Sequence, residues 1–180
     1  VIESRGLGDV YKRQNILREA LMSKLVAGNW KMFGDQNMLS EIKVIDQYCH
    51  KIDCEVAICP PFQLILSAHQ QTKNIKIGAQ NCHINANGPH TGEVSAEMLI
   101  DVGAELVLVG HSERRQDNNE TNKIIKQKAE AVQRAGATAV VCIGETLEER
   151  KADRTLQVLQ EQMLNCCLLY TSPSPRDSMT

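Results

Sequence analysis

A chain of 180 residues with 42% hydrophobic and 23% charged residues can bury one sizeable core, and its length is compatible with one domain. Its 20 basic and 22 acidic side chains are spread along the sequence and give a net charge of -2, so no basic stripe indicates binding to nucleic acid or to an acidic membrane surface. These properties favour a small-molecule partner.

The two ends of the chain differ in pattern from its middle. Residues 1–14 (VIESRGLGDVYKRQ) show no amphipathic period, and residues 168–180 (LLYTSPSPRDSMT) carry Ser-Pro repeats that suit neither helix nor strand. Both ends contain strings that resemble translated sequencing-adaptor sequence, with a disordered tail as the alternative, whereas Met22 resembles a natural start. We therefore predict a non-native or untranslated-derived leader at 1–21, a partial domain at 22–165 and a non-native tail at 166–180.

Five short apolar runs predict strands that are buried on both faces. They are LVAG (25–28), EVAICP (55–60), IKIGA (75–79), LVLVG (106–110) and TAVVCIG (138–144). The starts of these runs are about 20 to 32 residues apart, which is close to the ~31 residues of one strand–helix unit in an eight-fold barrel.

Helical periods lie between and after these runs. Three sets of residues each predict one face of a helix, namely Met38, Ile42, Ile45 and Cys49, then Ile125, Ala129 and Val132, then Leu156, Leu159 and Met163. Alternating strands and helices predict a parallel α/β sheet with right-handed crossovers. Both a doubly wound open sheet and a (β/α)8 barrel satisfy this pattern, and the periodicity does not choose between them.

Polar residues follow the predicted strands at the point where each one ends. Asn29 and Lys31 follow the first strand, and His111 follows the fourth. Because the carboxyl ends of parallel strands meet at one edge of a sheet, we expect these three side chains to converge on a single site.

The residue types at this edge suit the binding of an anionic substrate. His111 precedes a stretch that can open a short helix, whose N-terminal potential disfavours an imidazolium and favours a neutral ring that donates to a carbonyl. Lys31 beside the amide of Asn29 suits a phosphate-sized anion. An ordinary strand-end histidine and a surface lysine are the alternatives. We interpret Glu113 as a structural carboxylate rather than as the base.

Metal, cofactor and membrane signals are missing from the sequence. The other four histidines have no metal-ligand spacing, and no G-x-G-x-x-G or P-loop pattern is present, so we predict no cofactor. None of the seven cysteines forms a Cys-x-x-Cys pair, which favours reduced thiols. No apolar run approaches the ~20 residues of a membrane span, and residues 1–20 lack the centre of a signal peptide. We expect a cytoplasmic protein.

Five motifs resemble the triosephosphate isomerase family in its order and spacing. They are AGNWKM (27–32), GAQN (78–81), TGEVSAEML (91–99), VGHSERR (109–115) and VCIGETLEER (141–150), and the resemblance covers residues 23–165. It implies a (β/α)8 barrel that interconverts glyceraldehyde 3-phosphate and dihydroxyacetone phosphate in glycolysis and gluconeogenesis. It also implies a proton transfer through an enediolate, without a cofactor.

The same resemblance assigns roles to residues of this chain. It implies that His111 and Lys31 are catalytic, that Asn29 and Lys31 bind substrate, and that Ser112 and Glu113 support them. Residues 82–94 resemble the family's protruding loop, which implies a homodimer in which Thr91 approaches the site of the second subunit.

The resemblance also implies that this chain holds only about five of the eight units. The carboxylate base, the lid and the phosphate-binding backbone would belong to the remaining three, so we expect the 180-residue chain to be inactive alone, with unpaired edge strands. The alternatives are another sugar-phosphate isomerase on the same scaffold, or a non-enzymatic doubly wound module that binds a small molecule.

Overall fold

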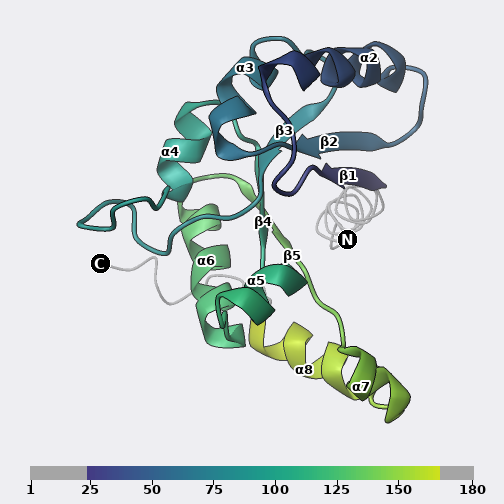
Figure 1. Ribbon diagram of the computed structural model, residues 1–180, viewed down its shortest axis with the longest axis vertical. Helices are drawn as coiled ribbons and strands as arrows, with labels where there is room; N and C mark the ends of the chain where they lie inside the picture. Colours follow the sequence, from purple (N-terminus) through teal and green to yellow (C-terminus); the bar gives the residue numbers. More distant parts are fainter. Residues whose placement is uncertain (1–23, 167–180) are drawn as a thin grey trace, which may run out of the picture.

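The computed structural model describes residues 24–166 of the chain (Figure 1). The leader predicted at 1–21 lies outside the described residues, as does the predicted tail apart from Cys166, which ends the last helix. Both remain predictions.

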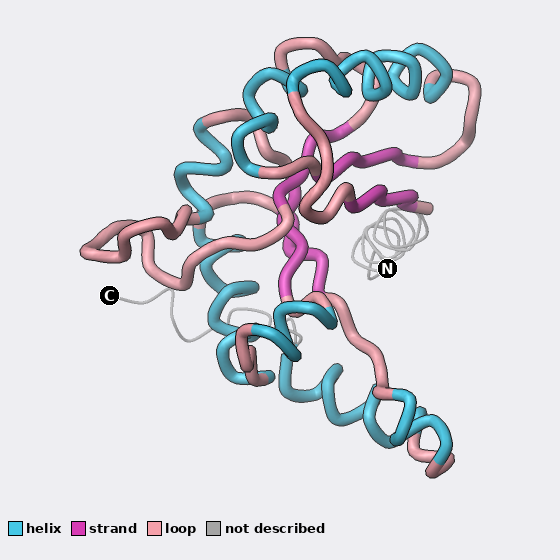
Figure 2. The backbone as a smooth tube through the Cα atoms, viewed as in Figure 1, coloured by secondary structure: helices cyan, strands magenta, loops and turns pink. Residues whose placement is uncertain are grey.

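Five parallel strands form a single curled sheet in which the strand order follows the chain order (Figure 2). They are β1 (Leu25–Asn29), β2 (Glu55–Cys59), β3 (Lys76–Ala79), β4 (Leu106–Val109) and β5 (Thr138–Val141). A doubly wound sheet reverses its order at a switch point, whereas strands added in order on one side curl toward closure. The sheet is therefore the first five strands of a (β/α)8 barrel, and the doubly wound alternative is wrong.

Helices follow the strands and cover the outer side of the curl, with α8 beside α6 (Figure 1). The α-helices are α2 (Leu39–Cys49), α3 (Ile65–His69), α4 (Ala96–Asp101), α5 (Ser112–Asp117), α6 (Asn122–Arg134), α7 (Leu147–Lys151) and α8 (Thr155–Cys166). Short 3-10 turns precede α2 at Gln36–Met38 and α3 at Phe62–Leu64.

The central strands β2, β3 and β4 are buried on both faces, as their apolar runs predict. The same prediction is wrong for β1 and β5, whose residues are exposed or only partly buried. In β4, Val107 and Val109 belong to the main core cluster, which also contains buried side chains of α2, α3, α4 and α6. The alternate residues Leu106 and Leu108 belong to a second cluster with residues of β2. Since successive side chains of a strand point to opposite faces, the second cluster fills the concave side of the sheet.

The predicted helix face is confirmed in α6, partly confirmed in α2 and wrong in α8. Ile125, Ala129 and Val132 are fully buried in the core, as predicted. In α2 the prediction for Met38 was wrong: the side chain of Asp35 caps the 3-10 turn before the helix, so Met38 ends that turn and stays exposed. Leu39 is buried in its place.

In α8 the predicted face was wrong. Leu156 and Met163 are 82% and 52% exposed, whereas Val158 and Cys166 are buried. The helix packs on α6 and α7 rather than on the sheet, so a different side of it is covered.

A buried carboxylate ties α2 to the start of β3. The backbone N–H groups of Lys73, Asn74 and Ile75 donate to Oδ1 of Asp46 at 2.9, 2.6 and 3.1 Å. Burial by itself raises the pKa of Asp46, but these donors together lower it below its ordinary value. The charged carboxylate therefore fixes where the strand begins, and with it the register of the residues that follow β3.

The outer strands present open edges in the described part of the chain. Within residues 24–166, β1 pairs only with β2 and β5 only with β4. Leu25 and Val26 of β1 are 40% and 58% exposed. Unpaired backbone groups beside exposed apolar side chains are the features that promote association between sheets.

We predict that the purified 180-residue chain aggregates or adopts a loose state. Replacing the exposed Val26 by lysine should raise the soluble fraction, because a charge on an edge strand opposes pairing between chains. The matched control Val107→Lys, which places the same charge in a fully buried position of β4, should abolish solubility. Sedimentation velocity and thermal unfolding followed by circular dichroism measure this. A monomer with sharp, cooperative unfolding would contradict the prediction.

Candidate active site

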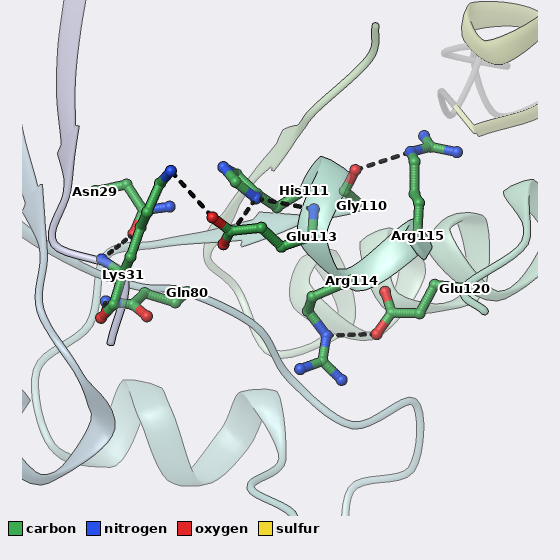
Figure 3. Close-up of polar contacts among 9 residues, drawn as sticks. All are labelled: Asn29, Lys31, Gln80, Gly110, His111, Glu113, Arg114, Arg115 and Glu120. Carbon is green, nitrogen blue, oxygen red and sulfur yellow. Dashed lines mark hydrogen bonds and ion pairs between the residues drawn. The ribbon is translucent and has the colours of Figure 1, made fainter. Parts of the chain in front are cut away.

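The carboxyl edge of the sheet holds a polar cleft of about 220 Å³. Its lining includes Asn29 at the end of β1, Lys31 just after it, Gln80 after β3, and His111 and Glu113 after β4. The structure thus brings together the three residues that the sequence places at one edge, Asn29, Lys31 and His111 (Figure 3).

Lys31 stands in a tight turn that two side-chain amides hold in place. Its φ of 54° lies in the left-handed region, which is uncommon for a residue with a Cβ. The N–H of Lys31 donates to Oδ1 of Asn29 at 2.8 Å, and Nε2 of Gln80 donates to the carbonyl of Lys31 at 2.9 Å. The same Nε2 donates to the carbonyl of Cys59 at 2.8 Å, which anchors the turn to the end of β2. These bonds aim the lysine at the cleft.

Glu113 bridges the lysine and the histidine. Its Oε1 lies 3.0 Å from Nζ of Lys31, and its Oε2 lies 3.3 Å from Nδ1 of His111 (Figure 3). The hydrogen bond from Lys31 holds the pKa of the Glu113 carboxyl below its ordinary value, and the charge of Lys31 acts in the same direction. An ionised carboxylate held between two partners orients them and is a poor base, which agrees with the structural interpretation of Glu113.

His111 caps the N-terminus of α5 with its own ring. Nδ1 accepts a hydrogen bond from the backbone N–H of Glu113 at 3.4 Å. To accept from that N–H, Nδ1 must carry a lone pair. A hydrogen bond from Nδ1 to the carboxylate of Glu113 would instead require a proton on the same nitrogen. We assign the proton to Nε2, because the backbone donor has no other acceptor among the described residues. A neutral ring then presents Nε2–H to the cleft as a donor.

A buried ionic network lies behind the cleft. Oε1 of Glu120 accepts from Nε of Arg114 at 2.5 Å and from Nζ of Lys128 at 2.7 Å, and Nζ of Lys128 also donates to Oδ1 of Asn81 at 2.6 Å. Burial raises the pKa of Glu120, but the bonds from Lys128 and Arg114 outweigh burial and lower it. The carboxylate therefore stays charged and connects the segment after β3 with α5 and α6.

The guanidinium of Arg115 lies on the other side of α5. Its Nε donates to the carbonyl of Gly110 at 2.9 Å, and one terminal nitrogen donates to Oδ1 of Asn122 at 2.7 Å. The other terminal nitrogen donates to the carbonyl of Cys142 at 3.1 Å and lies 3.7 Å from Sγ of Cys166. One side chain therefore joins the ends of β4 and β5 to α6 and α8.

Comparison with known proteins identifies the family. The family model that matches is described as triosephosphate isomerase, and it aligns with residues 24–174. The chain belongs to the triosephosphate isomerase family.

Relatives in this family align over most of the present chain. A triosephosphate isomerase of Ruegeria sp. is 49% identical over 140 residues, which are 78% of this chain and 57% of the relative. One of Rhodopseudomonas palustris is 44% identical over 150 residues, or 80% and 59% of the two chains. The crystal structure of triosephosphate isomerase from Bartonella henselae superposes with a TM-score of 0.80 at 40% identity, covering 83% of this chain and 64% of that one.

The chain spans between 57% and 59% of the length of these two curated relatives. What the complete relatives do is therefore a proposal for this protein rather than a finding. The fold is a finding, because five parallel strands in chain order and the structural match agree.

The loop over residues 82–94 projects from the body between β3 and α4 (Figure 1). Asn85 bridges two stacked rings in it: its backbone N–H donates to Nδ1 of His83, and its amide nitrogen lies 2.9 Å from Nε2 of His90. Thr91 is exposed on this loop. The geometry is compatible with the contact to a second subunit that the family resemblance implies.

The second cavity near the site, of about 290 Å³, also borders His111. Ser112 and Arg115 line it, together with Cys142 and Glu145 from the segment after β5. Ser112, expected to support the His111 loop, lies at the first position of α5 and lines this second cavity.

Sequence reasoning missed Gln80, the Glu120 network and Arg115. The polar pair Gln80-Asn81 directly after β3 was the available signal for the first of these. Among the described residues, no group of three or more His, Cys, Asp or Glu side chains is arranged to hold a metal ion. In residues 24–166, no helix has the length and apolar character needed to cross a membrane.

We predict that Glu120→Ala strongly destabilises the fold, because it leaves the ammonium of Lys128 buried without its carboxylate. Removing one partner of a buried pair typically costs about 3–5 kcal/mol. The test uses a chimaera in which residues 24–166 replace the matching part of the Ruegeria relative, with the free energy of unfolding measured in urea.

The control Glu120→Gln keeps an acceptor for Lys128 and should cost less. Because the pKa of Glu120 is lowered in the folded state, its contribution is present above the ordinary carboxyl pKa of about 4.3 and is lost as the pH falls through the lowered value. Equal unfolding free energies for the parent chimaera and Glu120→Ala at pH 7 would contradict this account.

Proposed function

We propose that these residues are the first five strand–helix units of a triosephosphate isomerase that interconverts glyceraldehyde 3-phosphate and dihydroxyacetone phosphate, in glycolysis and gluconeogenesis. The observation that carries this proposal is the convergence of Asn29, Lys31 and His111 on one cleft at the carboxyl edge of the sheet. An ammonium, an amide and a neutral imidazole in one cleft suit a phosphorylated substrate with a reactive carbonyl.

His111 acts as the electrophile in this proposal. Its Nε2–H donates to the substrate carbonyl oxygen, which stabilises the negative charge that develops when a proton leaves the adjacent carbon. The ring then moves a proton between the two oxygens of the enediolate. The hydrogen bond from the backbone of Glu113 to Nδ1 supports this role, because it keeps the proton on the nitrogen that faces the cleft.

Lys31 and Asn29 bind the substrate. The ammonium of Lys31 offsets the negative charge of substrate and enediolate, and Glu113 limits where that ammonium can move. Oδ1 of Asn29 is already engaged by the N–H of Lys31, so its amide nitrogen is the group that donates to a substrate oxygen.

The base that removes the carbon-bound proton comes, by the family resemblance, from beyond the fifth unit. Glu113 is not that base, because the bond from Lys31 lowers the pKa of its carboxyl and so weakens it as a proton acceptor. The proposal includes a homodimer in which the 82–94 loop contacts the second subunit and Thr91 lies near the partner's site. It also includes a cytoplasmic location and catalysis without a cofactor.

We predict that the chimaera with the Ruegeria relative is an active isomerase, whereas the 180-residue chain alone shows no measurable activity. Turnover of glyceraldehyde 3-phosphate in a coupled assay measures both. His111→Gln in the chimaera should lower kcat by about 10²- to 10⁴-fold, the usual contribution of a positioned acid–base group.

The matched control is His50→Gln, which changes an exposed histidine at the C-terminal end of α2. It should leave kcat and KM unchanged. A chimaera that folds but does not turn over substrate would sink the proposed function, as would one in which His111→Gln matches the parent.

A further inference from the structure

The guanidinium of Arg115 has more protein partners than a surface arginine on a short helix usually has. All three nitrogens of its guanidinium carry a contact: the carbonyls of Gly110 and Cys142, the amide of Asn122 and the sulfur of Cys166. None of these partners is a carboxylate, so the side chain is held by geometry rather than by an ion pair. We propose that Arg115 is a positioning residue for His111, an inference that rests on the proposed isomerase function.

The key contact is the one to Gly110 (Figure 3). The carbonyl of Gly110 and the N–H of His111 belong to one planar peptide unit, so fixing the carbonyl also fixes the backbone from which the His111 ring extends. Gly110 has a φ of 73°, and a Cβ there would lie 2.9 Å from the side chain of Ile125. A glycine in the left-handed region has other conformations open to it, and the bond from Arg115 selects one.

The other contacts prevent the guanidinium from moving. Asn122 at the start of α6 and the carbonyl of Cys142 after β5 hold its two terminal nitrogens at 2.7 and 3.1 Å. A planar fork satisfies acceptors in fixed directions, whereas a lysine ammonium on a flexible stem reaches fewer of them at once. Arg115 therefore transmits the position of β5 and α6 to the peptide that carries His111.

The neighbouring Arg114 does not hold the peptide before His111, so this role is not shared by every arginine on α5. Its Nε bonds to Glu120 in the buried network, and the side chain lines the first cleft (Figure 3). Arg115 borders the second cavity instead, beside His111. Its loss should leave the lysine and amide that bind substrate in place while the imidazole becomes misplaced.

The predicted signature is a loss in kcat without a matching change in KM. In the chimaera, Arg115→Lys and Arg115→Ala should lower kcat by about 10- to 100-fold, the scale expected for a reacting group displaced by about 1 Å, with KM within about two-fold. Millimolar guanidinium ion should restore part of the kcat of Arg115→Ala and none of that of Arg115→Lys. The control Arg154→Lys alters an arginine whose ion pair with Glu149 lies outside the cleft and the 82–94 loop, and it should change neither constant.

A second readout does not depend on turnover. With ¹⁵N-labelled histidine, the ring signals of His111, assigned through His111→Gln, should be single and sharp in the parent chimaera and in Arg154→Lys, and broadened or doubled in both Arg115 variants. If the parent chimaera folds but is inactive, the proposed function fails and these signals alone decide the role of Arg115.

The role is overturned if the His111 signals match the parent in Arg115→Lys. It is also overturned if kcat and KM of Arg115→Lys match the parent while only its thermal stability falls. If Arg115→Ala does not fold, Arg115→Lys alone carries the same test.

Discussion

Parallel pairing in chain order puts the carboxyl ends of β1 and β4 at the same edge of the sheet, although Asn29 and His111 are about eighty positions apart in the sequence. The buried alternation of β4 fixes this arrangement, because Val107 and Val109 pack outward while Leu106 and Leu108 fill the concave side. A slip by one residue would exchange the two faces and move His111 away from Lys31. The position of the site is therefore a consequence of core packing.

Glu113 fixes how the charged and polar groups of Lys31 and His111 are arranged at the cleft. The carboxylate of Glu113 contacts the ammonium of Lys31 and the ring of His111, and the backbone N–H of Glu113 donates to Nδ1 of that ring. An ammonium and an imidazole therefore face one cleft, and the carboxylate of Glu113 beside them is paired with Lys31. Had Glu113 been the base, its pKa would need to lie near neutrality, whereas the bond from Lys31 lowers it.

The strands, the parallel class of the sheet and the meeting of Asn29, Lys31 and His111 were predictable, because each leaves a local mark in the sequence. An apolar run predicts a strand, and a polar residue just past it predicts a side chain at the carboxyl edge of the sheet. The position of Gln80 just past β3 carried this mark, but the roles of Gln80 and Arg115 did not, because their partners are backbone carbonyls of distant residues, such as Cys59 and Cys142. Every residue has a backbone carbonyl, so no pattern of residue types reveals which carbonyl accepts a hydrogen bond from a given side chain. The prediction of the buried face of α8 failed for a related reason. Periodicity identifies an apolar face of a helix, but it does not say which element packs against the helix.

Both missed side chains do the same kind of work, since each holds a backbone segment that carries a polar group of the cleft. Gln80 holds the carbonyl of Lys31, whose φ of 54° is unfavourable without support, and Arg115 holds the carbonyl of Gly110 before His111. Lys31 thus stands in the left-handed region, and His111 directly follows a left-handed glycine. Gln80 ties the first segment to Cys59 at the end of β2, and Arg115 ties the second to Cys142 after β5. The strained φ of Lys31 persists only where the surroundings over-determine the backbone. The end of β2 and the end of β5 provide those surroundings, which makes strands that contribute no side chain to the chemistry necessary for placing it.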